Sequence, residues 1–311
     1  MNTTMMTLFG GVFALLTIAS IIGFVLSRRV TTEGGQETVS NLNARIKAWW
    51  MMIAIFAVAF YFGKTITIVL FALTSFYCLR EFLSITPTRA EDHTATVAAF
   101  YLFIPLQYWL IWSDWQSLFS ILIPVWAFLL LPLLAVLKGE TQDFLTRSAK
   151  IQWALMLNVY CISHAPALLL LDIPGFEENF LLLFFLITVV QLSDVMQYVF
   201  GKLFGKTKVA PRVSPAKTWE GLIGGGLTAS AIGAGLFWIT PFTPVQAGLL
   251  AATIVFAGFA GGLVLSAVKR SLGAKDWGTM IEGHGGALDR MDSVSFSAPV
   301  FFHLVNYFFV P

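Results

Sequence analysis

The sequence has 311 residues, of which 57% are hydrophobic and 12% are charged, and its mean hydropathy is +0.79. A soluble domain is roughly 45–50% apolar and about 25% charged, so this composition excludes an ordinary soluble protein and indicates a polytopic membrane protein. The net charge of +2 provides no strongly basic surface, so we expect no nucleic-acid partner. Cys78 and Cys161 fall in apolar runs without metal-site spacing, which favours two buried free thiols.

Ten apolar runs follow along the chain, most of them near the roughly 20 residues that a helix needs to cross a bilayer. The first has no basic segment before it, so we expect a spanning helix and not a cleaved signal peptide. The second run is short and the third follows almost directly, so the count falls to eight or nine if these two are not separate spans. The predicted spans are Met5–Leu26, Trp49–Phe62, Thr65–Leu83, Thr94–Trp112, Leu118–Leu137, Ile151–Leu171, Phe180–Phe200, Gly221–Thr240, Val245–Val268 and Val294–Val310.

Charge in the connecting loops alternates along the chain. Nearly all Lys and Arg lie in the loops at 27–48, 84–93, 138–150, 201–219 and 269–292, and the intervening loops carry almost none, with Lys64 as the exception. Since basic loops favour the cytoplasmic side, we predict that these five loops face the cytoplasm and that both termini lie outside. Residues 28–49 are either an ordinary loop or an amphipathic segment on the membrane surface.

These patterns predict an all-α polytopic integral membrane protein with about nine or ten transmembrane helices. Internal repeats and long polar segments are absent from the sequence, so we expect one helical membrane domain over residues 1–311. Within it, 1–180 form N-terminal helices and 181–311 carry the motifs. Small residues recur four apart in the helices predicted at 221–240 and 245–268, a spacing that lets helices pack closely, and a ligand-lined cavity is the alternative.

Charge is densest between Ser266 and Ser293. Asp289 and Asp292 are three residues apart, so on a helix both carboxylates face one side. Two like charges this close favour a cation between them, and hard oxygen ligands favour Mg²⁺ or another divalent cation. A solvated helix start, where the helix dipole favours acids, is the alternative interpretation.

Bases and glycines precede these acids. Lys269, Arg270 and Lys275 lie on the way to His284-Gly285-Gly286, where bare backbone can approach an anion just before a helix start. Bases, bare backbone and paired acids together indicate a phosphate ligand with a metal ion. For the bases alone, topological anchoring at a cytoplasmic helix end is the plainer alternative.

A second constellation lies in the preceding basic loop, Ser193–Gly221. Plain anchoring, or contact with anionic lipid head groups, would explain its five bases, but Ser214 and Thr218 add hydroxyl groups that anchoring does not need. Asp194 lies about six residues inside the end of its predicted span, and an acid there is costly enough to indicate function. The five bases are Lys202, Lys206, Lys208, Arg212 and Lys217.

Both constellations resemble the phosphatidate cytidylyltransferase family, the CDP-diacylglycerol synthases. The resemblance is close over roughly residues 190–300, and the first 180 residues resemble the family only as apolar helices. The downstream signature is matched by Ser266, Lys269-Arg270, Lys275-Asp276, His284-Gly285-Gly286 and Asp289-Arg290-Met291-Asp292. The upstream signature is matched by Asp194, Gly201-Lys202, Phe204-Gly205-Lys206, Lys208, Pro211, Ser214-Pro215 and Lys217-Thr218-Trp219-Glu220-Gly221.

The sequence also departs from this family pattern. Gly262 and Leu265 stand where many bacterial members have acids, and Glu282 replaces the usual proline before the glycines. Ala287 replaces a bulky apolar residue, and Val195-Met196 replaces small ones. These departures indicate a divergent branch of the family.

The resemblance implies that CTP and phosphatidate react to CDP-diacylglycerol and pyrophosphate for phospholipid biosynthesis, at the cytoplasmic face of a bacterial inner membrane. It implies Mg²⁺ held by Asp194, Asp289 and Asp292, with Asp276 assisting. Lys217, Lys269, Arg270, Lys275 and Arg290 would neutralise the phosphates. Substrate-binding roles fall to Lys206, Lys208, Ser214, Thr218, Ser266, His284, Gly285 and Gly286. The lipid tails would enter among the small-residue helices, and a homodimer stays open.

Two other interpretations follow from the same features. A CTP-dependent kinase acting on a polyprenol or similar lipid alcohol would release CDP in place of pyrophosphate. A lipid or ion transporter would show broken helices in paired halves and charges at mid-membrane, whereas here the charge gathers at one edge.

Overall fold

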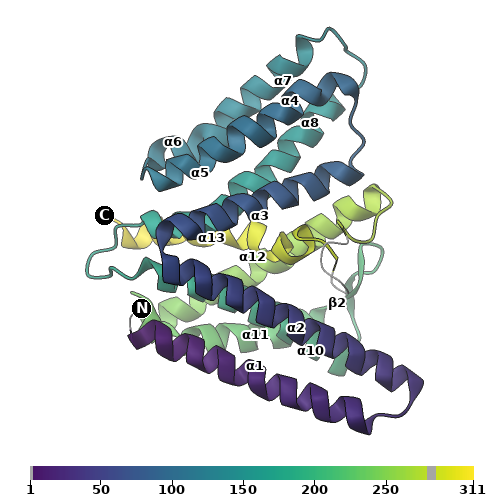
Figure 1. Cartoon of the computed structure of the whole chain (residues 1–311), viewed down its shortest axis with the longest axis vertical. Helices are drawn as coiled ribbons and strands as arrows, with labels where there is room; N and C mark the ends of the chain where they lie inside the picture. The colour runs from purple at the N-terminus through teal and green to yellow at the C-terminus, as the bar shows by residue number, and fades with distance from the viewer. Residues whose placement is uncertain (1–2, 279–284) are drawn as a thin grey trace.

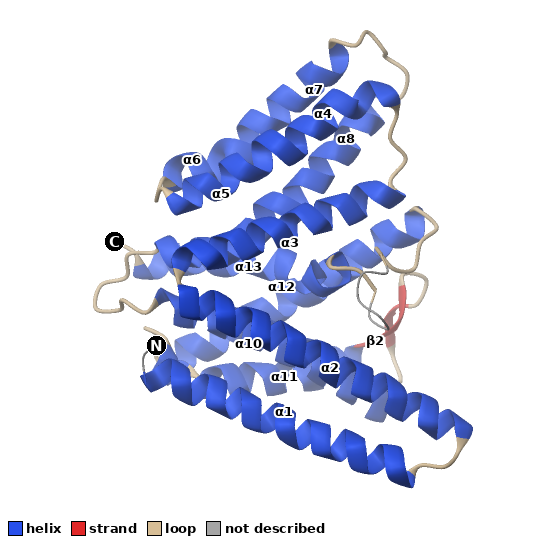
Figure 2. Ribbon diagram, in the orientation of Figure 1, coloured by secondary structure: helices blue, strands red, loops and turns tan. Residues whose placement is uncertain are grey.

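The structure, a computed structural model, describes residues 3–278 and 285–311 (Figure 1). Helices make up nearly all of it, and a small two-stranded antiparallel sheet lies at one edge (Figure 2). Within these described residues, eight helical segments are long and apolar enough to cross a membrane. The predicted all-α polytopic membrane fold is therefore confirmed.

The N-terminal helices form a hairpin followed by a third long helix. They are α1 (Thr3–Arg29), α2 (Glu33–Phe62) and α3 (Lys64–Ile85). Gly63, with φ 84°, is the single residue between α2 and α3 and lies in the left-handed region that favours glycine. The second and third predicted spans are thus separate helices. Residues 28–49 were expected to be a loop or an amphipathic surface segment. They are helical from Glu33 onward, where α2 begins.

The middle of the chain forms three spans that are each interrupted by a wider π-type turn. Pro105 and Pro124, which lack a backbone N–H, lie beside or within two of these turns. The first span is η1 (Ala90–Asp92), α4 (His93–Ala98), η2 (Ala99–Phe103) and α5 (Ile104–Trp112). The second is α6 (Gln116–Ile121), η3 (Leu122–Ala127) and α7 (Phe128–Val136), and the third is α8 (Phe144–Leu155), η4 (Met156–Cys161), α9 (Ile162–Ala167) and η5 (Leu168–Leu170).

The C-terminal part places four helices around the small sheet. They are α10 (Asn179–Leu203), α11 (Trp219–Gly235), α12 (Pro244–Ser271) and α13 (Leu288–Phe309), with β1 (Lys208–Ala210) and β2 (Ser214–Thr218) between α10 and α11, and η6 (Phe237–Ile239) after α11. A Cβ on Gly225 would collide with the backbone of Gln197 in α10, and one on Gly233 with Ala251 in α12. The small residues therefore serve close helix packing, and lipid entry between these helices stays a prediction.

Loop charge and position agree. Both termini lie at one edge of the molecule, and the five basic connections, including the β1–β2 hairpin, lie at the opposite edge (Figure 1). We call this the basic edge. Helices α11, with 17 residues, and α13, with 22, run between the same two edges. The alternating charge pattern thus corresponds to a real separation of the two ends of the bundle.

Candidate functional site

The two predicted constellations meet near the basic edge, where the last turns of α10 and α12 approach β2 and the start of α13. Ser293 connects the acids of two helices there. Its hydroxyl donates to Asp194 Oδ1 at 3.1 Å and lies 3.4 Å from Asp292 Oδ1. Asp292 Oδ1 also accepts from the Ser293 backbone N–H at 2.7 Å. Across the described residues, the hydrogen bonds to Asp194 and Asp292 all fall on Oδ1, so each Oδ2 is available to a ligand.

Lys217 brings a cation to these acids. Its ammonium donates to the Phe259 carbonyl at 3.1 Å and lies 4.6 Å from the centre of the Phe259 ring. Burial lowers the pKa of Lys217 below its ordinary value, although the Asp292 and Asp194 carboxylates act in the opposite direction. We call Asp194, Lys217, Asp292 and Ser293 the carboxylate–lysine cluster.

Gly262 gives Lys217 its place. A Cβ on Gly262 would lie 2.5 Å from the Lys217 ammonium and 3.7 Å from Asp292 Oδ2. The position at which the sequence departs from many relatives is therefore filled by a cation from another element. The lysine occupies the space that a side chain at 262 would need.

Asp289 has a different environment, although it is only one helical turn from Asp292. Its Oδ1 pairs with the Lys269 ammonium at 2.6 Å, and both side chains are about nine-tenths buried. Its Oδ2 accepts from the backbone N–H groups of Trp277 and Gly286, each at 2.9 Å. The carboxylate is thus saturated by the protein itself. Asp289 joins α12, the following loop and the start of α13.

Glu81 of α3 is a site residue that sequence reasoning missed. Its two carboxylate oxygens accept from the backbone N–H groups of Ala287 and Leu288, at 2.9 and 2.8 Å. It thereby caps N–H groups at the start of α13 that have no partner within the helix. The next residue, Phe82, stacks on Trp277 with ring centroids 5.0 Å apart. A single acid at the end of an apolar run, some 200 residues from its partners, gave no signal beyond its charge.

The glycines before α13 do approach anions closely, as predicted, but those anions belong to the protein. Gly285 has φ 77°, and a Cβ there would lie 2.6 Å from an Asp289 oxygen. A Cβ on Gly286 would collide with the Glu81 carboxylate. The backbone donors near these glycines therefore bind Asp289 and Glu81. His284, also predicted to contact ligand, lies outside the described residues.

The predicted hydroxyl ligands differ in what they already bind. Thr218 is buried, and its hydroxyl accepts from the Gly221 N–H as the N-cap of α11, while its predicted contact with phosphate stays a prediction. The Ser266 hydroxyl donates to the Gly262 carbonyl at 2.6 Å within its own helix. Ser214 begins β2 and is half-buried.

The remaining predicted bases surround the cluster at greater distance. Arg270 is exposed and donates to the carbonyls of Val213 and Ala274, at 3.4 and 3.1 Å, which ties the hairpin to the loop after α12. Arg290 is half-buried and near enough to Asp194 to influence it electrostatically. Four further predicted residues are exposed at the basic edge: Lys206, Lys208, Lys275 and Asp276.

The carboxylate–lysine cluster fits a Mg²⁺ ion that is shared with a nucleotide. The described residues hold no group of three or more His, Cys, Asp or Glu side chains placed for a metal. A protein-only cage is not required, however, because Mg²⁺ commonly takes one or two carboxylates together with substrate phosphates and water. Asp194 and Asp292 supply such a pair. Asp289, predicted as the third ligand, has its oxygens directed to Lys269 and the backbone.

Comparison with known proteins defines what kind of site this is. Residues 43–308, which include every described member of the site, match the cytidylyltransferase family. The chain belongs to the cytidylyltransferase family. Its family therefore makes this integral membrane protein a nucleotidyltransferase, and the predicted family resemblance is confirmed.

Individual relatives divide into two kinds. The chain is 38% identical over 299 residues to "Uncharacterized protein YnbB" of Escherichia coli (strain K12), covering 95% of this chain and 96% of that one. It is 39% identical over 134 residues to the phosphatidate cytidylyltransferase of Aquifex aeolicus, covering 43% and 49% of the two chains, and 44% identical over 120 residues to that of Mycobacterium leprae, covering 38% of each. This cytidylyltransferase thus matches under half the length of the relatives that carry a substrate in their name, as a divergent branch would.

Proposed function

We propose that this cytidylyltransferase transfers the cytidylyl group of CTP to phosphatidate, giving CDP-diacylglycerol and pyrophosphate. The observation that carries the proposal is the carboxylate–lysine cluster, in which two acids with available oxygens lie beside a half-buried lysine near the basic edge. Such a cluster suits a metal-bound polyanion. The names of the partial-length relatives support phosphatidate as the lipid.

The reaction needs little from side-chain nucleophiles. A phosphate oxygen of phosphatidate attacks the α-phosphorus of CTP, and the bond from that phosphorus to the bridging oxygen of the β-phosphate breaks, so pyrophosphate leaves with the bonding electrons. A phosphate monoester has its second pKa near 6, so the attacking oxygen is ionised at neutral pH and requires no general base. The obstacle is repulsion between two polyanions, which positioning and charge neutralisation overcome.

The residues of the cluster divide this work. Asp194 and Asp292 would hold Mg²⁺, which supplies Lewis-acid neutralisation of the triphosphate when bound. Lys217 places its ammonium where the phosphates of both substrates converge, and its partial burial strengthens the interaction. Lys269 is fixed by Asp289 at the adjoining wall. Exposed Lys206, Lys208, Lys275 and half-buried Arg290 would attract the nucleotide and the departing pyrophosphate, with His284 and Asp276 as further candidates from the sequence.

The basic edge is proposed to face the cytoplasm, with both termini on the other side of a bacterial inner membrane. Two observations support this orientation: the five basic loops gather at one edge, and the site lies at that same edge. CTP is a cytosolic reagent, so a site that consumes it must open to that side.

The test uses purified protein in lipid nanodiscs with CTP and phosphatidate. We expect pyrophosphate and a CDP-lipid in equal amounts, dependent on phosphatidate and abolished by excess chelator until Mg²⁺ is restored. Release of CDP with a phosphorylated lipid alcohol would establish the kinase alternative. Pyrophosphate release that is indifferent to phosphatidate, or product formation undiminished in chelator, would contradict the proposal.

A further inference from the structure

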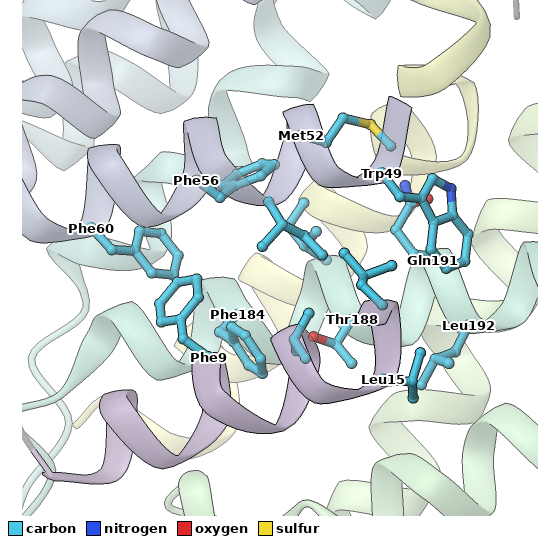
Figure 3. A pocket seen from close by; sticks show the side chains of 14 residues that line it. Phe9, Leu15, Trp49, Met52, Phe56, Phe60, Phe184, Thr188, Gln191 and Leu192 are labelled. Carbon is cyan, nitrogen blue, oxygen red and sulfur yellow. The ribbon is translucent and has the colours of Figure 1, made fainter. Parts of the chain in front are cut away.

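An apolar pocket lies between α1, α2 and α10 (Figure 3). Its volume is about 250 Å³, and fourteen residues line it. Thr188 and Gln191 are the only two of the fourteen whose side chains contain oxygen. A space of this composition does not hold ordered water, because too few polar partners are available, and it is suited to an apolar ligand.

The pocket has an aromatic end and a more polar end. Phe9, Phe60 and Phe184 gather at one end (Figure 3), where the ring centroid of Phe9 lies 5.9 Å from that of Phe60 and 6.0 Å from that of Phe184. Trp49 and Gln191 lie at the other end (Figure 3). Tryptophan is favoured at the boundary between apolar and polar regions of a membrane. Along α10 the lining therefore changes from the aromatic end to the end that contains Trp49 and Gln191.

Helix α10 connects the pocket with the site. Ile187 and Gln191 line the pocket, and Asp194 follows them by seven and three residues, spacings that place all three along one side of a helix. Asp194 is thus less than one turn beyond Gln191, which lies at the more polar end of the pocket. From Phe184 to Asp194 the helix rises about 15 Å, which is the length available to a chain whose polar end lies at Asp194.

We propose that this pocket holds an acyl chain of the lipid substrate, with the phosphate of that lipid at Asp194 and the chain directed toward Phe9, Phe60 and Phe184. The inference rests on the proposed function and adds to it the place of the lipid tail. It commits to a bound substrate chain and not to bulk membrane lipid, since α10 both lines the pocket and carries Asp194.

Chain-length preference tests this assignment. Val12→Trp would place an indole in the pocket from α1, and Phe60→Ala would enlarge the aromatic end of the pocket. Ile18→Trp is the matched control, because Ile18 is 59% exposed on the same helix and does not line the pocket. For Val12→Trp we expect kcat/KM to fall about tenfold or more with long-chain phosphatidate, through KM, with little change for a short-chain analogue. Phe60→Ala should shift the preference toward longer chains. Equal effects at all chain lengths, or an equal effect of Ile18→Trp, would overturn the assignment.

A second measurement reads occupancy without turnover. A phosphatidate with a photoreactive group at the end of one acyl chain is irradiated with the full-length protein in nanodiscs. We expect labelling of α1, α2 and α10 near Phe9, Phe60 and Phe184 that unlabelled phosphatidate suppresses. Labelling that is not suppressed, or that falls equally at Ile18, would identify bulk lipid as the occupant. Because this assay contains no CTP, suppressible labelling in a protein that forms no CDP-lipid would refute the proposed function alone, whereas normal turnover with unsuppressed labelling would refute the pocket alone.

Discussion

Asp289 and Asp292 lie three residues apart on α13, but their environments differ in a way that separates two tasks. Asp289 is saturated: Lys269 and two backbone N–H groups occupy both of its oxygens. Asp292 accepts hydrogen bonds from Ser293 at Oδ1, and its Oδ2 lies toward Gly262 and Lys217. One carboxylate is part of the frame of the site, and the other is available to its ligands.

The comparison shows that two acids on one helical face can have different partners. Helical spacing places both side chains on one face, but the partners opposite that face decide what each does. Lys269 comes from α12 and Trp277 from the loop after it, whereas Asp194 comes from α10. The hydrogen bonds to both oxygens of Asp289 stabilise the structure. Asp292, near the half-buried Lys217, keeps one oxygen that can bind a ligand. The following predictions test this division of labour.

The largest effect is expected for Asp289→Asn, which should abolish activity and also destabilise the protein. The substitution leaves the nearly buried Lys269 without its counter-ion, a change that costs about 3 kcal/mol or more in comparable sites. The apolar helices are unchanged, so the variant should still insert. Thermal unfolding and activity of the purified protein measure both effects. Asp143→Asn is the control, because it removes an exposed ion pair with Arg89 at the same edge.

Asp292→Asn should lower kcat roughly 100- to 1,000-fold, the range typical of losing one group that stabilises transition-state charge. Its thermal stability should stay near that of wild type, because the substitution removes one of two neighbouring negative charges and keeps an acceptor for the Ser293 N–H. Asp194→Asn should behave in the same way. A large loss of stability in Asp292→Asn would place this residue in the frame and remove the distinction from Asp289.

Glu81 extends the frame to the N-terminal half of the chain. Glu81→Ala leaves the Ala287 and Leu288 donors without their acceptor and should lower kcat about tenfold or more, with a smaller change in KM for CTP. Glu81→Gln keeps one oxygen acceptor and should recover part of the loss, whereas the shorter Glu81→Asp should not. Equal activity of all three variants would show that the contact has no role in positioning α13.

The smallest effect is expected for Gly262→Ala. The added methyl group would meet the flexible end of Lys217, so the ammonium should move and activity should fall severalfold while the fold persists. Gly261→Ala is the informative neighbour, because its Cβ would lie 2.6 Å from the rigid Asp292 carbonyl and should lower stability. Gly10→Ala, with nothing within 4 Å, is the neutral control. Full activity of Gly262→Ala would mean that the position of Lys217 is unimportant.

Much of the fold could be predicted because membrane spans are written as apolar runs. Those runs and the alternating loop charges predicted the helices, the separation of basic loops to one edge and the role of small residues in α11 and α12. The start of α2 was missed, since residues 33–48 are polar enough to resemble a loop and their helicity depends on the α1–α2 hairpin. Apolar runs and loop charges predict the structure correctly where the membrane itself requires them.

The site could be predicted only in part, because its partners come from distant segments. Asp194 was predicted from the cost of an acid within a span, Asp292 from its spacing to Asp289, and Lys217 from the basic loop and the family resemblance. In the structure Ser293 connects the two acids, and Lys217 is close enough to influence both electrostatically. Gly285 and Gly286 were correctly associated with close approach to an anion, but spacing could not indicate that Asp289 and Glu81 are those anions. Likewise, the N-cap role of Thr218 and the place of Lys217 over Gly262 depend on packing between helices, which no local motif records.

The most direct test of this account is a Mn²⁺ titration followed by electron paramagnetic resonance, with CTP present, in wild type, Asp289→Asn and Asp292→Asn. Mn²⁺ replaces Mg²⁺ as an observable ion with similar oxygen ligands. We predict that Asp292→Asn weakens Mn²⁺ binding about tenfold or more, while Asp289→Asn, measured below its unfolding temperature, binds Mn²⁺ more tightly than Asp292→Asn does. Weaker binding in Asp289→Asn than in Asp292→Asn would contradict the assignment of the cation to the carboxylate–lysine cluster.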